Sequence, residues 1–82
     1  MPRYLGVHKL KAGMSDSDIR AGWEKYCESC EAAGLRPVSV TYSVEKGFAY
    51  CQTDAESSEQ VRKAHEVVTI PLEDVIEVQV LD

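Results

Sequence analysis

The stretch VSVTYSVEKGFAYCQT, residues 38–53, decides the fold. Over residues 38–44 apolar and hydroxyl side chains alternate, which is the period of a β-strand with one buried face. The Lys-Gly pair at 46–47 is a tight-turn signal, and FAYCQT predicts a returning strand. If this pair forms the whole loop, Tyr42 faces Cys51 across the hairpin. The thiol then lies on the same sheet face as the valines.

A helix is predicted before this hairpin. Ser15 is the expected N-cap, and the aspartates that follow it suit the positive end of the helix dipole. Gly34 is the expected stop. Between them apolar residues recur at helical spacing and predict one buried face, made of Ile19, Trp23, Tyr26, Cys27, Cys30 and Ala33.

A second helix is predicted after the hairpin. Ser57 and Gln60 have the spacing of a capping box. The apolar stripe that follows consists of Val61, Ala64 and Val68, and His65 falls inside it. Pro71 ends this region.

Two outer segments complete the pattern. RYLGVHKLK, residues 3–11, predicts a first strand, and VIEVQVL, residues 75–81, predicts a last one. The order strand, helix, strand, strand, helix, strand is that of the α+β ferredoxin-like fold. We therefore expect a single domain, residues 1–82, with a four-stranded antiparallel sheet, room for a short fifth strand, and both helices on one sheet face.

Aromatic residues are expected on the sheet face that the helices leave open. Tyr4, Phe48 and Tyr50 fall there in the simplest register, with His8 beside Tyr4. Such a cluster predicts a homodimer that packs sheet against sheet. The first strand is no more polar on one side than on the other, so the opposite register stays open, and it would bring His8 to the same face as Cys51 and His65.

Composition excludes several classes of partner. The net charge of -5 and the pI near 4.9 argue against nucleic acid, because phosphate binding needs clustered Lys and Arg. No apolar run reaches the length of a signal peptide or a membrane span. We expect a cytoplasmic protein whose three cysteines stay reduced.

The pair Cys27 and Cys30 has C-x-x-C spacing but a poor position for chemistry. Redox pairs of this kind sit at helix N-termini, whereas this pair lies in the late turns of the predicted helix, among glutamates. No second short-spaced pair completes a structural zinc site. We expect both thiols to pack in the core, and a thiol-based sensor ranks last among the possible functions.

His8, His65 and Cys51 are the alternative ligands. Each histidine taken alone is best explained as an ordinary structural residue. If dimerisation or the sheet geometry brings them together with Cys51 or a carboxylate, a metal site becomes possible, and imidazole and thiolate suit nickel, copper or zinc.

The chain resembles a family of small bacterial proteins of unassigned function that includes a nickel-binding, nickel-responsive member. The resemblance rests on His8 in the first strand, GFAYCQTDAESSEQVRKAHE at 47–66 and IPLEDVIEVQV at 70–80, and is most specific from Gly47 to Val78. It implies a ferredoxin-like fold, a homodimer and metal ligation at the matching positions His8, Cys51 and His65. The members most like metal binders carry a histidine in the first helix, where this chain has Trp23.

Two functions follow as expectations. The first is a dimeric, non-enzymatic protein that binds nickel or another divalent transition metal. The second is a small-ligand binder or enzyme of the dimeric α+β-barrel kind. Its cavity of about 300 Å³ or more would lie beside His65, lined by Trp23, Tyr26, Tyr42 and Cys51. The sequence contains no nucleophile-base constellation, so no reaction can be named.

Overall fold

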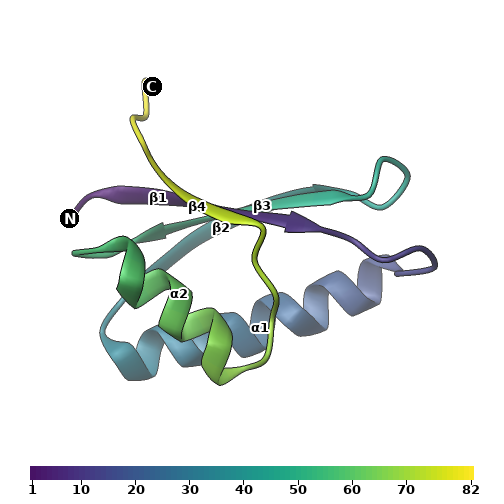
Figure 1. The fold of residues 1–82 in the computed structure, drawn as a ribbon, viewed down its shortest axis with the longest axis horizontal. Coiled ribbons are helices and arrows are strands. Elements are labelled where there is room, and N and C mark those ends of the chain that lie inside the picture. The colour runs from purple at the N-terminus through teal and green to yellow at the C-terminus, as the bar shows by residue number, and fades with distance from the viewer.

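A four-stranded antiparallel sheet covered on one side by two helices makes up the fold (Figure 1). The computed structural model describes residues 1–82 in full. Its elements are β1 (Arg3–Lys9), α1 (Asp16–Ala33), β2 (Arg36–Ser43), β3 (Phe48–Asp54), α2 (Ser58–Val67) and β4 (Asp74–Val78). The strand order β2-β3-β1-β4 places β1 and β3 at the centre, so the predicted ferredoxin-like fold is confirmed. There is no fifth strand, and β1 and β4, the first and last strands of the chain, are shorter than the predicted ranges 3–11 and 75–81.

Both helices begin, and α1 ends, where local chemistry predicts, whereas α2 ends at Val67, before the predicted stop at Pro71. The Ser15 side chain accepts the N–H of Asp18, whose carboxylate accepts the N–H of Ser15 in return. Ser57 and Gln60 form the same reciprocal box at the start of α2. Gly34 ends α1 in the left-handed conformation with φ 76°, where its N–H reaches the last helical carbonyls.

The hairpin between β2 and β3 differs from the prediction by two residues. Tyr42 pairs with Ala49 and Val40 pairs with Cys51, so the turn spans residues 44–47. A two-residue type I′ loop needs a positive φ at both central positions, and only Gly47 of the expected Lys-Gly pair adopts one. Because the shift is an even number of residues, Cys51 stays on the expected face.

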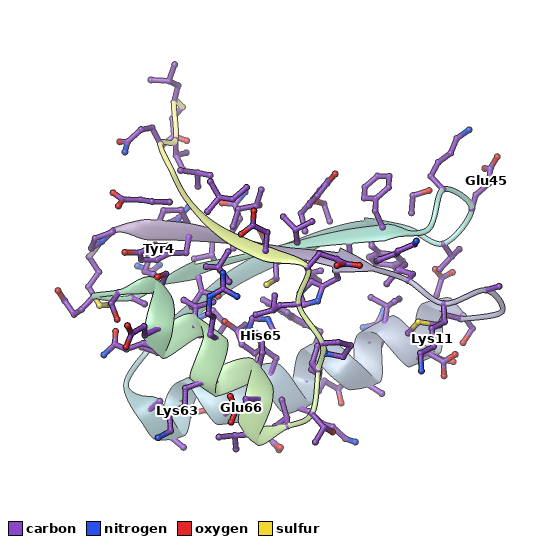
Figure 2. All side chains as sticks on the ribbon, viewed as in Figure 1. Tyr4, Lys11, Glu45, Lys63, His65 and Glu66 are labelled. Atoms are coloured by element: carbon purple, nitrogen blue, oxygen red, sulfur yellow. The ribbon has the colours of Figure 1, made fainter.

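The first strand has the register opposite to the simplest prediction. Tyr4, Gly6 and His8 point toward the helices, and Tyr4 is only 8% exposed, so its expected place on the open face is wrong. Gly6 explains the choice, because a Cβ at this position would stand 2.6 Å from the sulfur of Cys51. The crowded side of β1 therefore takes its smallest residue. His65 lies under the sheet, on the side of the helices (Figure 2).

The sheet surface away from the helices, here called the open face, carries a cluster of apolar side chains among polar ones. Phe48 and Tyr50 lie on it as predicted, with ring centroids 5.0 Å apart. The pairing of β1 with β3 and β4 adds Leu5, Val7, Ile76 and Val78. Tyr50 is 36% exposed and Ile76 is 44% exposed. Nothing in the chain itself covers this surface.

The helix face of the sheet carries the core. Ile19, Tyr26 and Cys30 are the buried residues of α1, and Cys30 is fully enclosed. Ala33, at the end of the predicted stripe, is exposed. Neither helix is long and apolar enough to cross a membrane.

Candidate metal centre

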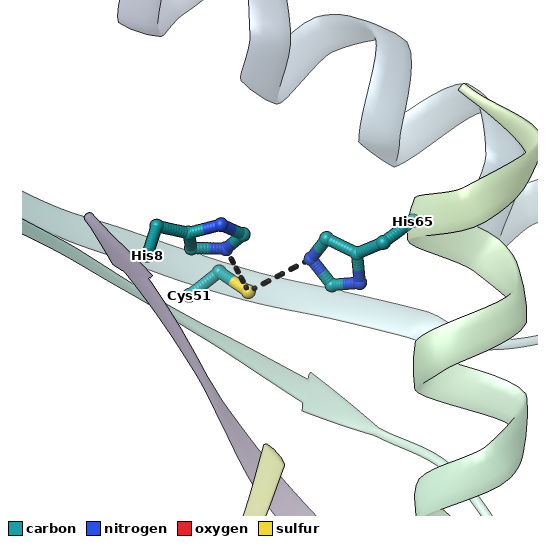
Figure 3. Close-up of side chains that lie close together, drawn as sticks. All are labelled: His8, Cys51 and His65. Atoms are coloured by element: carbon teal, nitrogen blue, oxygen red, sulfur yellow. Dashed lines mark hydrogen bonds between the residues drawn. The ribbon is translucent and has the colours of Figure 1, made fainter. Parts of the chain in front are cut away.

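Three side chains from three elements converge beneath the sheet. His8 lies near the end of β1, Cys51 in the middle of β3, and His65 on the buried side of α2 (Figure 3). The Cys51 Sγ atom is 3.4 Å from the Nε2 atom of each histidine. One nitrogen or sulfur atom from each residue lies within 4.8 Å of the others, a spacing that could hold one metal ion.

The sheet register and the helix stripe bring the three together. Gly6 is paired with Cys51 and His8 with Ala49, so His8 and Cys51 are diagonal neighbours on the same face of adjacent strands. His65 is 1% exposed in the buried stripe of α2. The three candidates named from the sequence are therefore neighbours in the structure, and their convergence depends on the register of β1.

Backbone carbonyls fix the orientation of both imidazoles. His8 Nδ1 lies 2.9 Å from the carbonyl oxygen of Pro71, and His65 Nδ1 lies 2.7 Å from that of Val61. A carbonyl only accepts hydrogen bonds, so each Nδ1 must be the protonated donor. In a neutral ring the proton is then absent from Nε2. Both Nε2 lone pairs therefore point at the sulfur of Cys51.

Burial keeps all three groups uncharged near neutral pH. Burial lowers the pKa of His65 to about 4, opposed by the Val61 carbonyl and reinforced by His8. It also lowers the pKa of His8, with the Pro71 carbonyl opposing. Burial raises the pKa of the Cys51 thiol to about 12, although backbone groups of Gly6 and Cys51 favour the thiolate. Without a metal, the site is a thiol between two neutral imidazoles.

Aromatic rings surround His65. The ring of Tyr26 stacks on it with centroids 3.9 Å apart, and the ring of His8 lies 5.1 Å away. The Tyr26 hydroxyl is bonded to the Thr53 hydroxyl at 2.7 Å, and burial raises the pKa of Tyr26 far above its usual range. Tyr26 is therefore uncharged, and its ring packs against the imidazole of His65 and limits its movement.

A cavity of about 340 Å³ adjoins the cluster, larger than the 300 Å³ that the second expected function requires. His8, Cys51 and His65 line it together with Trp23 and Tyr26. Tyr42, the other residue expected there, is not among the lining residues.

Two features of the site were missed at the level of sequence. Gly6 leaves the space that the sulfur of Cys51 occupies, and a glycine in the interior of a predicted strand is the signal that could have shown it. The carbonyls of Pro71 and Val61 orient the histidines, and no residue type marks a backbone acceptor.

The C-x-x-C pair, Cys27 and Cys30, lies outside the site. Burial raises the pKa of both thiols, and Glu24 and Glu31 raise that of Cys27 further. Both are free and sit in the late turns of α1. A sensor thiol is exposed and has a lowered pKa, so the geometry speaks against that function.

Comparisons with known proteins agree with this architecture. The family model described as "Nickel responsive protein SCO4226-like" matches residues 4–78. The crystal structure of SCO4226 from Streptomyces coelicolor A3(2) superposes with a TM-score of 0.88 at 16% sequence identity, over 98% of this chain and 99% of that one. At that identity the structural match shows the shared fold. No curated protein matches this sequence.

Proposed function

Since this chain belongs to the family of nickel responsive, SCO4226-like proteins, we propose that it is a small, dimeric, non-enzymatic protein that binds a divalent transition metal such as nickel. His8, Cys51 and His65 are the proposed ligands. The proposal places the protein in the cytoplasm, where Cys51 stays reduced and able to bind the ion.

The observation that supports the proposal most directly is that the metal-free site has one proton too few for its two close contacts between nitrogen and sulfur. Two Nε2 lone pairs point at the sulfur, and a thiol has one proton to donate. One of the two close contacts therefore sets a lone pair against sulfur without a hydrogen between them. A cation among the three atoms removes this repulsion and satisfies both imidazoles.

The donor set selects the kind of metal. Neutral imidazole and thiolate suit late first-row metals, whereas calcium and magnesium require oxygen ligands. The carbonyls of Pro71 and Val61 hold the two ligand rings through their Nδ1 atoms, as the outer partners of metal-bound histidines do. When bound, the ion would draw the thiol proton off Cys51 and leave one thiolate and two neutral rings as its ligands.

Calorimetric titration of the reduced protein with nickel, copper and zinc tests the proposal. We expect one ion per chain with a dissociation constant well below about 0.1 mM, an affinity of roughly 5 kcal/mol. His8→Ala with His65→Ala, and separately Cys51→Ser, should weaken binding sharply. Cys27→Ser is the matched control, because this half-buried thiol lies outside the cluster. Equal metal affinity in Cys51→Ser and Cys27→Ser would contradict the proposed ligand set.

The open face supports the dimeric part of the proposal. Apolar side chains from three adjacent strands, β3, β1 and β4, form a continuous uncovered surface that includes Tyr50 and Ile76. A chain of 82 residues buries only about 60 to 65% of its unfolded surface, so a second copy adds needed burial. Ile76→Glu should convert a dimer to a monomer in sedimentation velocity, while Val67→Glu, on the exposed side of α2, should not. A monomeric unsubstituted protein at tens of micromolar would contradict this assembly.

The 340 Å³ cavity favours a second candidate function, the binding of a small organic ligand without metal. The chemistry of the site favours binding over catalysis. A nucleophilic cysteine acts as its thiolate, and burial holds the Cys51 thiol protonated. Binding of a small molecule by metal-free protein, abolished by blocking the cavity, would establish this candidate over the first.

A further inference from the structure

The cluster of His8, Cys51 and His65 offers fewer ligands than its metal would take. No other histidine, cysteine or carboxylate belongs to the group of three. Zinc takes four ligands, and nickel and copper commonly take four to six. Sites with three protein ligands leave a position for water or substrate, whereas closed structural sites supply all four from the protein. At least one coordination position is therefore left for a molecule from outside the chain.

The cavity gives that position a way in. All three proposed ligands line it, and the walls continue through side chains of α1, β2 and the segment after α2. Its rim includes the exposed residues Lys9, Lys11 and Asp18. An exogenous ligand can thus reach the ion from the cavity. On another side of the site, the ring of Tyr26 stacked on His65 blocks access.

The cavity walls and the site charge define the class of ligand. Beyond the three ligands, its lining is mainly apolar and aromatic, with Ile19, Trp23 and Val40 among the residues present. A volume of about 340 Å³ lies at the small end of the roughly 300–1,000 Å³ typical of ligand pockets, which suits a small organic molecule. A divalent ion with one thiolate and two neutral imidazoles keeps one net positive charge, and an anionic donor neutralises it.

Gly22 leaves part of the cavity wall without a side chain. It lies inside α1, where glycine is less stable than alanine by about 0.5–1 kcal/mol, and it lines the cavity. A Cβ at this position would meet no atom within 4 Å. The φ angle of Gly22 is not positive, so the backbone conformation does not require glycine. The open space around the position shows that crowding does not require it either. What the missing side chain provides is room in the cavity.

We propose that the metal-loaded site binds a small monocarboxylate with an apolar or aromatic body, the carboxylate on the ion and the body in the cavity. The proposal rests on metal binding by His8, Cys51 and His65. It extends that function, because the ion becomes part of a receptor for an organic anion.

Cobalt-loaded protein provides the test, because the visible spectrum of Co²⁺ reports a change of ligand. Three probes are titrated: 3-phenylpropanoate, propanoate and 3-phenylpropan-1-ol. We expect 3-phenylpropanoate to change the Co²⁺ bands and to bind about ten- to hundred-fold tighter than either other probe, since it alone has both the anion and the buried ring. Metal-free protein should bind it at least about ten-fold more weakly.

Gly22 supplies matched variants. Gly22→Phe should retain Co²⁺ and lose most affinity for 3-phenylpropanoate, while Gly22→Ala should retain both. Circular dichroism verifies that each variant is folded, and Gly22→Leu replaces the phenylalanine variant if that one is not.

Each result decides a different claim. Absence of Co²⁺ binding would overturn the proposed function and this inference together. Bound Co²⁺ whose spectrum ignores 3-phenylpropanoate would overturn the inference alone. Equal binding of 3-phenylpropanoate by metal-free protein would establish the metal-independent ligand function instead. Unchanged affinity for 3-phenylpropanoate in a folded Gly22→Phe variant would show that the probe binds outside the cavity.

Discussion

Replacing Gly6 by alanine tests how closely the fold is fitted around the candidate site. The added Cβ would stand 2.6 Å from Cys51 Sγ, 3.2 Å from a methyl carbon of Leu72 and 3.6 Å from His65 Cε1. Non-bonded carbon atoms prefer about 3.5–4.0 Å, so the sulfur must move by roughly 1 Å. The backbone of Gly6 is not in the left-handed region, so alanine introduces no conformational strain.

Two effects of opposite sign set the magnitude. Overpacking a filled core costs about 1–3 kcal/mol. Alanine in place of glycine within a strand regains about 0.5–1 kcal/mol of backbone entropy. We therefore expect a net loss of about 1–2 kcal/mol, which for a domain of this size lowers Tm by roughly 5–15 °C. Displacement of the Cys51 sulfur should also weaken metal binding by about 10–100-fold.

Gly22→Ala is the matched control, because the added methyl group meets open space. It should gain about 0.5–1 kcal/mol and raise Tm by about 3–6 °C. Thermal and urea unfolding of reduced, metal-free protein, followed by the fluorescence of Trp23, the only tryptophan, gives both values. If Gly6→Ala is as stable as Gly22→Ala and binds nickel as tightly as the unsubstituted chain, the close approach does not shape the site.

Three further predictions concern protonation. Metal affinity should rise about ten-fold per pH unit between pH 7 and 9, because binding displaces one proton from Cys51, whose pKa is raised to about 12; Cys51→Ser should remove this slope in titrations at several pH values. Metal-free protein should lose stability as the pH falls from about 6.5 to about 4. In this range His65 is protonated in the unfolded chain but stays neutral in the folded chain, so protonation favours unfolding. His65 should account for about 3 kcal/mol of this loss, His8, whose pKa is also lowered, adds to it, and a smaller acid sensitivity is expected in urea unfolding of His65→Gln. A thiol reagent at pH 7 should label Cys27 and Cys30 slowly in the folded protein and rapidly in urea, because the pKa of both thiols is raised, although only Cys30 lies in the core; fast labelling of the folded chain would contradict this.

Much of the fold could be predicted because the deciding signals are local. Ser15, Gly34 and Ser57 mark helix ends through hydrogen bonds and backbone angles that involve only neighbouring residues. Strand alternation in residues 38–44 likewise needs only the period of two. These features require no knowledge of distant packing.

The candidate site depended on information that is not local. The side of β1 on which His8 points could not be chosen from polarity, because both faces of the strand carry apolar residues beside polar ones. The hairpin register depended on whether Lys46 could take a positive φ, and the turn lengthened when it did not.

The sequence by itself determined the order of elements, the start of both helices, the end of α1, and the identity of the only two imidazoles available to Cys51. Tertiary structure decided that the three meet. A one-residue change of register would send His8 to the opposite face of the sheet. The space beside Gly6, filled by the sulfur of Cys51, and the burial of Tyr4 in the core favour the register that brings His8 to His65.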